Sequence, residues 1–266
     1  MIIIASFWVG TLSKYEILAI KSWLYHGYEF HLYTYTPVDN IPSGVIICDA
    51  NQILPQFLVE QYQSIANFAD LFRYKMIYDT GKIWTDLDVF CLNQIDLSSD
   101  YIFITERTIQ QGAFKSNDPQ KLVISFMKGV KNSDFMNSLF KKALQKINYI
   151  LPSNSNTGLS ADKHPAGRIL VKKEIDLWFN LEQIAEFVKP YNFAFPVDWW
   201  DFKKCFQPIN KYKASRGWTN EIDLDDMMQN SQLLCIHNGW VKHNKIDKEN
   251  PLEGSLYKKL FDKFDI

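Results

Sequence analysis

The sequence predicts an α/β fold whose central sheet is mainly parallel. Three observations support this prediction: short apolar runs typical of buried strands, segments whose apolar residues recur at helical spacing, and the alternation of the two along the opening third of the chain. Strands that alternate with helices are usually joined by crossover connections, so that the strands lie parallel in one sheet.

Three strands and one helix are expected before residue 50. Residues 2–7 form an unbroken apolar run, as in a strand covered on both faces. Ser13 and Glu16 form a capping box, and Gly27 stands where a helix that begins after Ser13 would end. The next two strands are expected at 29–35 and 45–48.

A second helix and a fourth strand follow. Apolar residues recur at helical spacing at Ile65, Phe68, Ala69, Phe72 and Met76. Thr80 and Gly81 interrupt this helix, and we expect the IWTDLDVF segment at 83–90 to form one continuous strand.

The pattern is looser after residue 100. The expected strands are 101–105, 193–195 and 233–236. Helices are expected after Ser133 and over 168–179, and the Lys-rich tail 242–266 is weakly amphipathic. Residues 152–167 are rich in turn-forming residues, and we expect a long loop there.

The composition excludes several classes of protein. The formal net charge of −1 argues against a nucleic-acid-binding protein, which would show a basic surface. The four cysteines are scattered, so we expect a reducing compartment and neither a disulfide framework nor a zinc site. No apolar stretch is long enough to cross a membrane. Residues 1–10 lack the basic start of a signal peptide, and we expect a cytoplasmic protein.

Asp86 and Asp88 are the first candidates for a functional site, because they stand one residue apart within an apolar run. In a continuous strand they would face the same side as Trp84 and Phe90. Two carboxylates so close repel each other unless a cation or a proton lies between them. Carboxylate, water and phosphate oxygens suit Mg²⁺ or Mn²⁺, so the pair predicts a metal site on a nucleotide-type substrate. The alternative is a D-x-D that falls by chance in a turn.

Asp70 and Arg73 are the second pair of candidates. They stand three residues apart on an expected helix and are therefore neighbours on its surface. They would present a carboxylate and a guanidinium to a polar ligand beside the metal. The alternative is an exposed ion pair, which stabilises a protein only slightly.

The order of these residues resembles a known signature. The segment ANFADLFRYKMIYDTGKIWTDLDVF at 66–90 contains N-x-x-D-x-x-R, a glycine, an aromatic residue and D-x-D. This order resembles the donor-site signature of glycosyltransferase family 32, which also occurs in the glucosylating domain of the large clostridial toxins. The opening SFWVG and the late CIHNGW resemble two further motifs of that family.

The sequence departs from the family's usual pattern at three places. Thr80 precedes Gly81 where the family has two glycines, and Trp84 stands where tyrosine is more usual. The family's T-G-P element is matched at best by Thr157-Gly158-Leu159. The resemblance therefore says more about the donor side than about the acceptor side.

The resemblance implies a GT-A fold, a single α/β domain over 1–266 with a mixed, mostly parallel central sheet flanked by helices. Residues 1–130 would bind the nucleotide sugar, and 131–241 would form the acceptor side and the late metal-binding strand. Residues 242–266 would form a basic helical tail. The implied reaction is metal-dependent transfer of a hexose or N-acetylhexosamine to a hydroxyl of a glycan acceptor, with retention at the anomeric carbon. A UDP-sugar is the favoured donor.

The same resemblance implies a role for each site residue. Asp88 would bind Mn²⁺ or Mg²⁺ directly, Asp86 would contact the ribose and the metal, and His237 would add a third contact; Asp86 and Asp88 are the catalytic candidates. The donor-binding candidates are Trp8, which would stack on the base, Asp70, Arg73, Trp84, Asp86, Asn238 and Trp240. The alternative for Trp8 and His237 is an ordinary place in the core.

Several alternatives stay open at this point. Loop 152–167, with Asn154, Asn156, Asp162 and His164, would either close over the donor or form plain surface. Tail 242–266 would either contact an anionic membrane that carries a lipid-linked acceptor or be solvated. We expect an oligosaccharide acceptor in bacterial surface polysaccharide synthesis. The alternative functions are a non-catalytic nucleotide-sugar-binding module and a D-x-D phosphotransferase of the haloacid dehalogenase type, which usually has Thr or Val where Phe90 stands.

Overall fold

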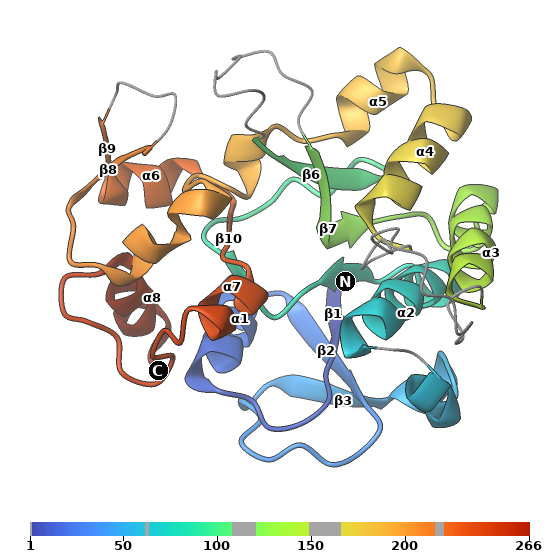
Figure 1. Cartoon of the computed structure of the whole chain (residues 1–266), viewed down its shortest axis with the longest axis horizontal. Coiled ribbons are helices and arrows are strands. Elements are labelled where there is room, and N and C mark those ends of the chain that lie inside the picture. Colours follow the sequence, from blue (N-terminus) through green and yellow to red (C-terminus); the bar gives the residue numbers. More distant parts are fainter. Residues whose placement is uncertain (1, 62–63, 108–120, 149–165, 216–220) are drawn as a thin grey trace, which may run out of the picture.

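The chain folds around a six-stranded sheet with helices on both faces (Figure 1). The structure is a computed structural model. It describes residues 2–61, 64–107, 121–148, 166–215 and 221–266.

The central sheet is mixed. Its strands follow one another in the order β3 (Val45–Asp49), β2 (Glu29–Thr34), β1 (Ile3–Phe7), β4 (Ile83–Thr85), β7 (Lys121–Lys128) and β6 (Ile102–Glu106). β1 is parallel to β2 and β4, and β2 is parallel to β3, whereas β7 is antiparallel to both β4 and β6. The expected fold class, α/β with a mixed and mostly parallel central sheet flanked by helices, is confirmed.

The remaining elements surround this sheet. The helices are α1 (Lys14–Tyr25), α2 (Ile65–Thr80), α3 (Asp134–Asn148), α4 (Arg168–Trp178), α5 (Leu181–Phe187), α6 (Leu224–Asn230), α7 (Asn238–His243) and α8 (Leu256–Phe264). Short 3₁₀ helices lie at 50–52, 56–61, 191–193 and 199–206. Two small antiparallel sheets pair β5 (Val89–Cys91) with β10 (Leu233–Cys235), and β8 (Lys211–Lys213) with β9 (Glu221–Asp223).

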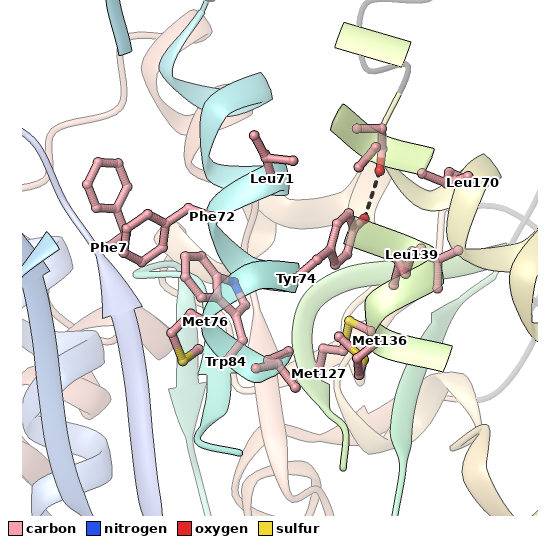
Figure 2. Packing of buried hydrophobic residues seen from close by; sticks show 14 of the residues in the cluster. Phe7, Leu71, Phe72, Tyr74, Met76, Trp84, Met127, Met136, Leu139 and Leu170 are labelled. Atoms are coloured by element: carbon pink, nitrogen blue, oxygen red, sulfur yellow. Dashed lines mark hydrogen bonds between the residues drawn. The ribbon is translucent and has the colours of Figure 1, made fainter. Parts of the chain in front are cut away.

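Two neighbouring residues of β7 show how both faces of the sheet are packed. Met127 lies in the cluster under α2 and α3, together with Trp84 and Met136 (Figure 2). Phe126 points to the other face, where its ring centroid lies 5.6 Å from that of Trp23 in α1. Side chains alternate across a strand, so α2 and α3 cover one face and α1 covers the other. Burial of Trp84 in this core fixes the end of β4.

The expected continuous strand at 83–90 is wrong. β4 ends at Thr85, and the chain turns through Asp86 and Asp88 before β5, with Val89 donating to the Asp86 carbonyl at 3.3 Å. The backbone N–H of Asp86 still donates to the carbonyl of Ser125 in β7, at 2.7 Å, but β5 pairs with β10 instead. The chain therefore leaves one sheet and enters another at the D-x-D, and the two carboxylates are presented by a turn.

The expected strand at 193–195 is also wrong. Pro190 begins a 3₁₀ helix at 191–193, because its fixed φ of −65° suits a helix start and its carbonyl accepts the N–H of Phe193 at 3.0 Å. The region is a turn that leads into the second 3₁₀ helix at 199–206.

Most of the other expected elements are confirmed. Glu16 accepts the backbone N–H of Ser13 at 2.8 Å at the start of α1. Gly81 ends α2 in the left-handed region, at φ 72°. The strands and helices expected at 29–35, 45–48, 101–105, 168–179 and 233–236 appear as β2, β3, β6, α4 and β10 within one or two residues.

The tail forms α8, whose apolar side is buried against the core at Leu256, Leu260, Phe261 and Phe264. The loop expected at 152–167 lies outside the described residues up to residue 165, with its Asn154, Asn156, Asp162 and His164, and so does the Thr157-Gly158-Leu159 element. Within the described ranges, no helix has the length and apolar character needed to cross a membrane.

Candidate active site

The D-x-D turn lies at the carboxyl ends of two parallel strands. β1 pairs with β4 through Ala5 and Trp84, so Trp8, which follows β1, and Asp86, which follows β4, stand at the same edge of the sheet. Ligands of open α/β sheets usually bind at this edge. The fold therefore puts the candidate residues where a ligand site is expected.

Asp86 is held by two side chains from the core. Arg73 donates to its Oδ1 at 2.8 Å, and the indole N–H of Trp84 donates to the same oxygen at 2.6 Å. Arg73 also bonds Asp70 at 3.0 Å, and its guanidinium lies 4.8 Å from the centre of the Trp84 ring. The structure thus brings Asp70, Arg73, Trp84 and Asp86 together in one network.

Most of this network is buried, and Asp86 is its most exposed member. The side chains of Arg73 and Asp70 are 3% and 8% exposed, so the alternative of an exposed ion pair is wrong. Burial alone would lower the pKa of Arg73, but the carboxylates of Asp86 and Asp70 raise it. The guanidinium is therefore a fixed positive charge beside the D-x-D turn.

Asp88 has a different environment. Its Oδ2 accepts the backbone N–H of Asn238 at 2.8 Å, whereas its Oδ1 is buried and has no hydrogen-bond partner in the described part of the chain. Burial and the nearby charge of Asp86 raise the pKa of Asp88 to about 6, against the opposing effects of His237 and the Asn238 N–H. A carboxylate in this position is destabilised unless a positive charge comes to it.

His237 lies between this turn and the end of β6. Its Nε2 is 3.3 Å from Glu106, which is 3% exposed and also bonds Lys121 at 2.7 Å and Arg168 at 3.6 Å. Burial by itself would lower the pKa of His237, but the hydrogen bond with Glu106 and the charge of Asp88 raise it. His237 is therefore held in place by a buried carboxylate.

Asn238 joins the D-x-D turn to α1. Its backbone N–H bonds Asp88, and its side chain donates to Glu16 at 2.8 Å. Glu16 is 1% exposed and also accepts a hydrogen bond of 2.6 Å from Lys248. The carboxylate that begins α1 thus anchors the turn that holds Asp88.

The two remaining candidate aromatics lie further out. Trp8 is half-buried against the core under α1, and its indole N–H is 3.4 Å from the Thr11 carbonyl. Trp240 is 44% exposed on α7, and its ring centroid is 6.1 Å from that of Trp199. Neither residue is enclosed in the network of Asp86.

Among the residues that the structure describes, four buried polar atoms of this region have no hydrogen-bond partner. They are Asn67 Oδ1, Arg73 Nε, Asp88 Oδ1 and Asn238 Oδ1. Buried polar atoms in folded proteins are nearly always paired, so an unpaired group needs an explanation. These atoms belong to α2, to the D-x-D turn and to the first residue of α7, and a polar ligand that completes them is the simplest explanation.

The residues present fit a hard divalent cation. In the described part of the chain, no three His, Cys, Asp or Glu side chains form a group able to hold a metal by themselves. Mg²⁺, however, commonly uses only one or two carboxylates and completes its shell with water and substrate phosphates. Asp88, with a buried and unpaired oxygen, suits direct binding better than Asp86, whose Oδ1 receives two hydrogen bonds.

A separate groove of about 380 Å³ lies between α4 and α5. Its lining includes Thr105 and Leu122, which pair with each other across β6 and β7 and are next to Glu106 and Lys121 along these strands. Because neighbouring side chains on a strand point to opposite faces, this groove and the D-x-D turn are distinct sites.

Two residues of the site escaped sequence reasoning. Glu16 is recognisable as a helix cap, but its second role depends on Asn238, more than two hundred residues later. Glu106 is signalled only weakly, by a carboxylate at the end of an apolar run, and its partners come from β7, α4 and the turn before α7.

Part of the chain that contributes to this site matches a known family model. Residues 13–109 match the family model described as "Glycosyltransferase sugar-binding region containing DXD motif", and the matched part contains Asp70, Arg73 and the D-x-D. None of the curated proteins compared with the chain matches it. A solved structure described as "PaToxG Glycosyltransferase" is 15% identical, covers 69% of this chain and 73% of its own, and gives a TM-score of 0.46. The chain thus contains a region similar to the sugar-binding region of DXD glycosyltransferases.

Proposed function

We propose that this protein is a metal-dependent, retaining glycosyltransferase of family 32. It transfers a hexose or N-acetylhexosamine from a nucleotide sugar, with a UDP-sugar as the favoured donor, to a hydroxyl of a glycan acceptor. A role in bacterial surface polysaccharide synthesis is the biological setting that we propose. The match of residues 13–109 supports the reaction class.

The single observation that supports the proposal best is the pairing pattern around the D-x-D turn. Asp86 Oδ1 already accepts hydrogen bonds from Arg73 and Trp84, while Asp88 keeps a buried oxygen with no partner among the described residues, and the pKa of Asp88 is raised to about 6. A cation at Asp88 would remove the cost of this buried negative charge. A donor sugar would pair the other three unpaired atoms. Its hydroxyls would donate hydrogen bonds to the amide oxygens of Asn67 and Asn238 and accept one from Arg73 Nε.

Asp88, and Asp86 in part, would hold the metal. When bound, Mn²⁺ or Mg²⁺ supplies Lewis-acid stabilisation of the charge that develops on the leaving diphosphate. His237, held by Glu106, is well situated to contact the diphosphate or the metal. Asn238 braces Asp88 through its backbone N–H, so that the carboxylate keeps its position as charge moves.

Asp70 and Arg73 would bind hydroxyls of the donor sugar from α2. Their mutual hydrogen bond and their burial fix both side chains before the donor arrives, which lowers the entropy lost on binding. Trp84 positions Asp86 at the ribose. Trp8 at the end of β1 would stack on the base, and Trp240 on α7 would cover the donor from the side of the solvent.

Donor hydrolysis tests the proposal. Purified protein is incubated with a panel of UDP- and GDP-sugars, with Mn²⁺ or with EDTA, and released nucleoside diphosphate is measured. We expect slow, Mn²⁺-dependent release from one donor, and loss of this release in Asp88→Asn. Asp79→Asn, which alters a half-exposed carboxylate on α2, is the matched control and should behave as wild type. If no nucleoside diphosphate is released and neither UDP nor GDP binds in a metal-dependent way, the assignment of the donor site is wrong.

A further inference from the structure

Three tryptophans gather beside the candidate active site. Trp199 and Trp200 begin the 3₁₀ helix at 199–206, and Trp240 lies on α7. The rings of Trp199 and Trp240 are stacked, with centroids 6.1 Å apart and planes at 30°. Trp200 meets Trp199 edge to face at 5.5 Å. Trp240 is 44% exposed and Trp199 is half-buried, so the stack reaches the surface.

The stack is held in place and joined to the site. The indole N–H of Trp199 donates to the Arg107 carbonyl at 3.3 Å, which fixes the orientation of its ring. The ammonium of Lys121 lies 5.7 Å from the centre of the same ring. Lys121 also bonds Glu106, the partner of His237. Three successive contacts therefore link Trp199 to His237, through Lys121 and Glu106.

A stack of indole rings that reaches the surface through Trp240 is suited to one kind of ligand. The face of an indole ring carries partial negative charge, and it attracts the weakly positive C–H groups on the apolar face of a pyranose ring. The sugar hydroxyls then stay in water or bond nearby polar groups, here the ammonium of Lys121. A fixed aromatic surface beside a polar network thus matches a saccharide better than a wholly apolar ligand.

We propose that Trp199 and Trp240, with Lys121, form the binding site of the acceptor saccharide. The role of this saccharide as the acceptor rests on the proposed function, whereas saccharide binding itself does not. The donor base has its own candidate in Trp8, at the end of β1. Trp240 contributes one ring face to the stack with Trp199 and can cover the donor with the other. A sugar ring on Trp199 would then lie next to the donor without displacing it.

The first test is binding, measured without donor. The protein is labelled with ¹⁵N at its tryptophan indoles, the Trp199 signal is assigned with Trp199→Tyr, and neutral mono- and oligosaccharides are titrated. We expect the signals of Trp199 and Trp240 to shift. The signal of Trp178 should stay unchanged, because Trp178 is as exposed as Trp240 but lies on α4, away from the stack. Trp199→Ala should weaken saccharide binding about tenfold or more, and Trp199→Tyr should retain part of it.

The second test is transfer to the saccharide that binds. Trp199→Ala should raise the KM for this acceptor about tenfold, while Trp178→Ala should leave it unchanged. If the wild type hydrolyses a donor but no saccharide at millimolar concentration moves the Trp199 signal, the inference is wrong and the proposed function stands. A Trp199 signal that responds to the nucleotide sugar and not to saccharides would assign the stack to the donor and also overturn the inference. If the protein binds a saccharide but no donor, saccharide binding at the tryptophan stack is supported and the proposed transferase function is wrong.

Discussion

Arg73 on α2 donates a hydrogen bond of 2.8 Å to Asp86 in the D-x-D turn, and the same guanidinium bonds Asp70 at 3.0 Å. One buried cation thus links two carboxylates that belong to different elements. The strength of this link matters because Asp86 and Asp88 repel each other, and Arg73 keeps Asp86 turned toward α2. The position of the whole D-x-D turn depends on this side chain.

Replacing Arg73 by lysine should therefore disturb both folding and donor binding. Lysine keeps the charge but cannot reach Asp70 and Asp86 together in the fork geometry of a guanidinium. We expect the free energy of unfolding to fall by about 3 kcal/mol, the range for breaking a buried ion pair, and donor affinity to fall at least tenfold. Urea denaturation and UDP binding measure the two effects. Asp79→Asn, which breaks the more exposed pair with Lys75 on the same helix, should cost less than about 1 kcal/mol. Equal losses in the two variants would contradict the linking role of Arg73.

Asp88 should make the stability of the metal-free protein depend on pH. Its pKa is raised to about 6 in the folded protein, above the ordinary value of about 3.9 that it has in the unfolded chain. At a pH below both pKa values, the Asp88 carboxyl is protonated in the folded and in the unfolded protein, so it does not lower the stability of the fold. As the pH rises through about 6, the folded protein must carry a buried charge, and its stability falls by up to about 3 kcal/mol.

Asp88→Asn removes this charge and gives the test. With EDTA present, the stability of the variant relative to the wild type should be clearly greater near pH 7.5 than near pH 4.5, as measured by urea denaturation at both values. A difference between the two proteins that does not change with pH would show that Asp88 is not the group responsible.

A divalent cation should restore the stability that the buried charge of Asp88 removes. At pH 7.5, Mn²⁺ should raise the melting temperature of the wild type, because binding to the folded state alone stabilises it by mass action. Asp88→Asn should lose most of this shift. At pH 5 the shift should shrink in the wild type, because the proton on Asp88 competes with the metal. Sodium chloride at equal ionic strength is the control, and an equal shift in salt would exclude a specific site.

The amino-acid sequence predicts the first half of this architecture well, because the signals are local. The cap at Ser13, the helical spacing from Ile65 to Met76 and the glycine at 81 are each read within a few neighbouring residues, and each element is confirmed. The two carboxylates of the D-x-D and the pair Asp70–Arg73 are found in the same way.

The elements and contacts that were missed depend on distant partners. Nothing within IWTDLDVF marks the residue at which the chain leaves the central sheet, because the break at Asp86 is set by pairing of β5 with β10. β7 was not predicted, and its place between β4 and β6 depends on long-range antiparallel pairing. Glu106 gains its partners from three other elements, so no sequence window contains them.

Glu16 should act as a positioning residue for the site although it begins a helix. Its carboxylate is 1% exposed and bonds both Asn238 and Lys248. Glu16→Gln keeps the shape of the side chain but removes the negative charge opposite Lys248. Because the Lys248 side chain is 20% exposed, water compensates part of the lost ion-pair energy. We expect about 2 kcal/mol of destabilisation. Because Asn238 braces Asp88, we also expect weaker Mn²⁺ and donor binding with the chemistry at the D-x-D unchanged.

Lys248→Met and the double variant separate the two roles of Glu16. If the ion pair accounts for the loss of stability, the double variant should lose less than the sum of the two single variants, by about 1 kcal/mol or more. The loss of Mn²⁺ affinity, in contrast, should follow Glu16→Gln and not Lys248→Met, because only Glu16 contacts Asn238. Calorimetric Mn²⁺ titration of the four proteins distinguishes these outcomes. If Lys248→Met lowers Mn²⁺ affinity as much as Glu16→Gln, the effect on the site arises from general loosening of the fold and not from the Glu16–Asn238 contact.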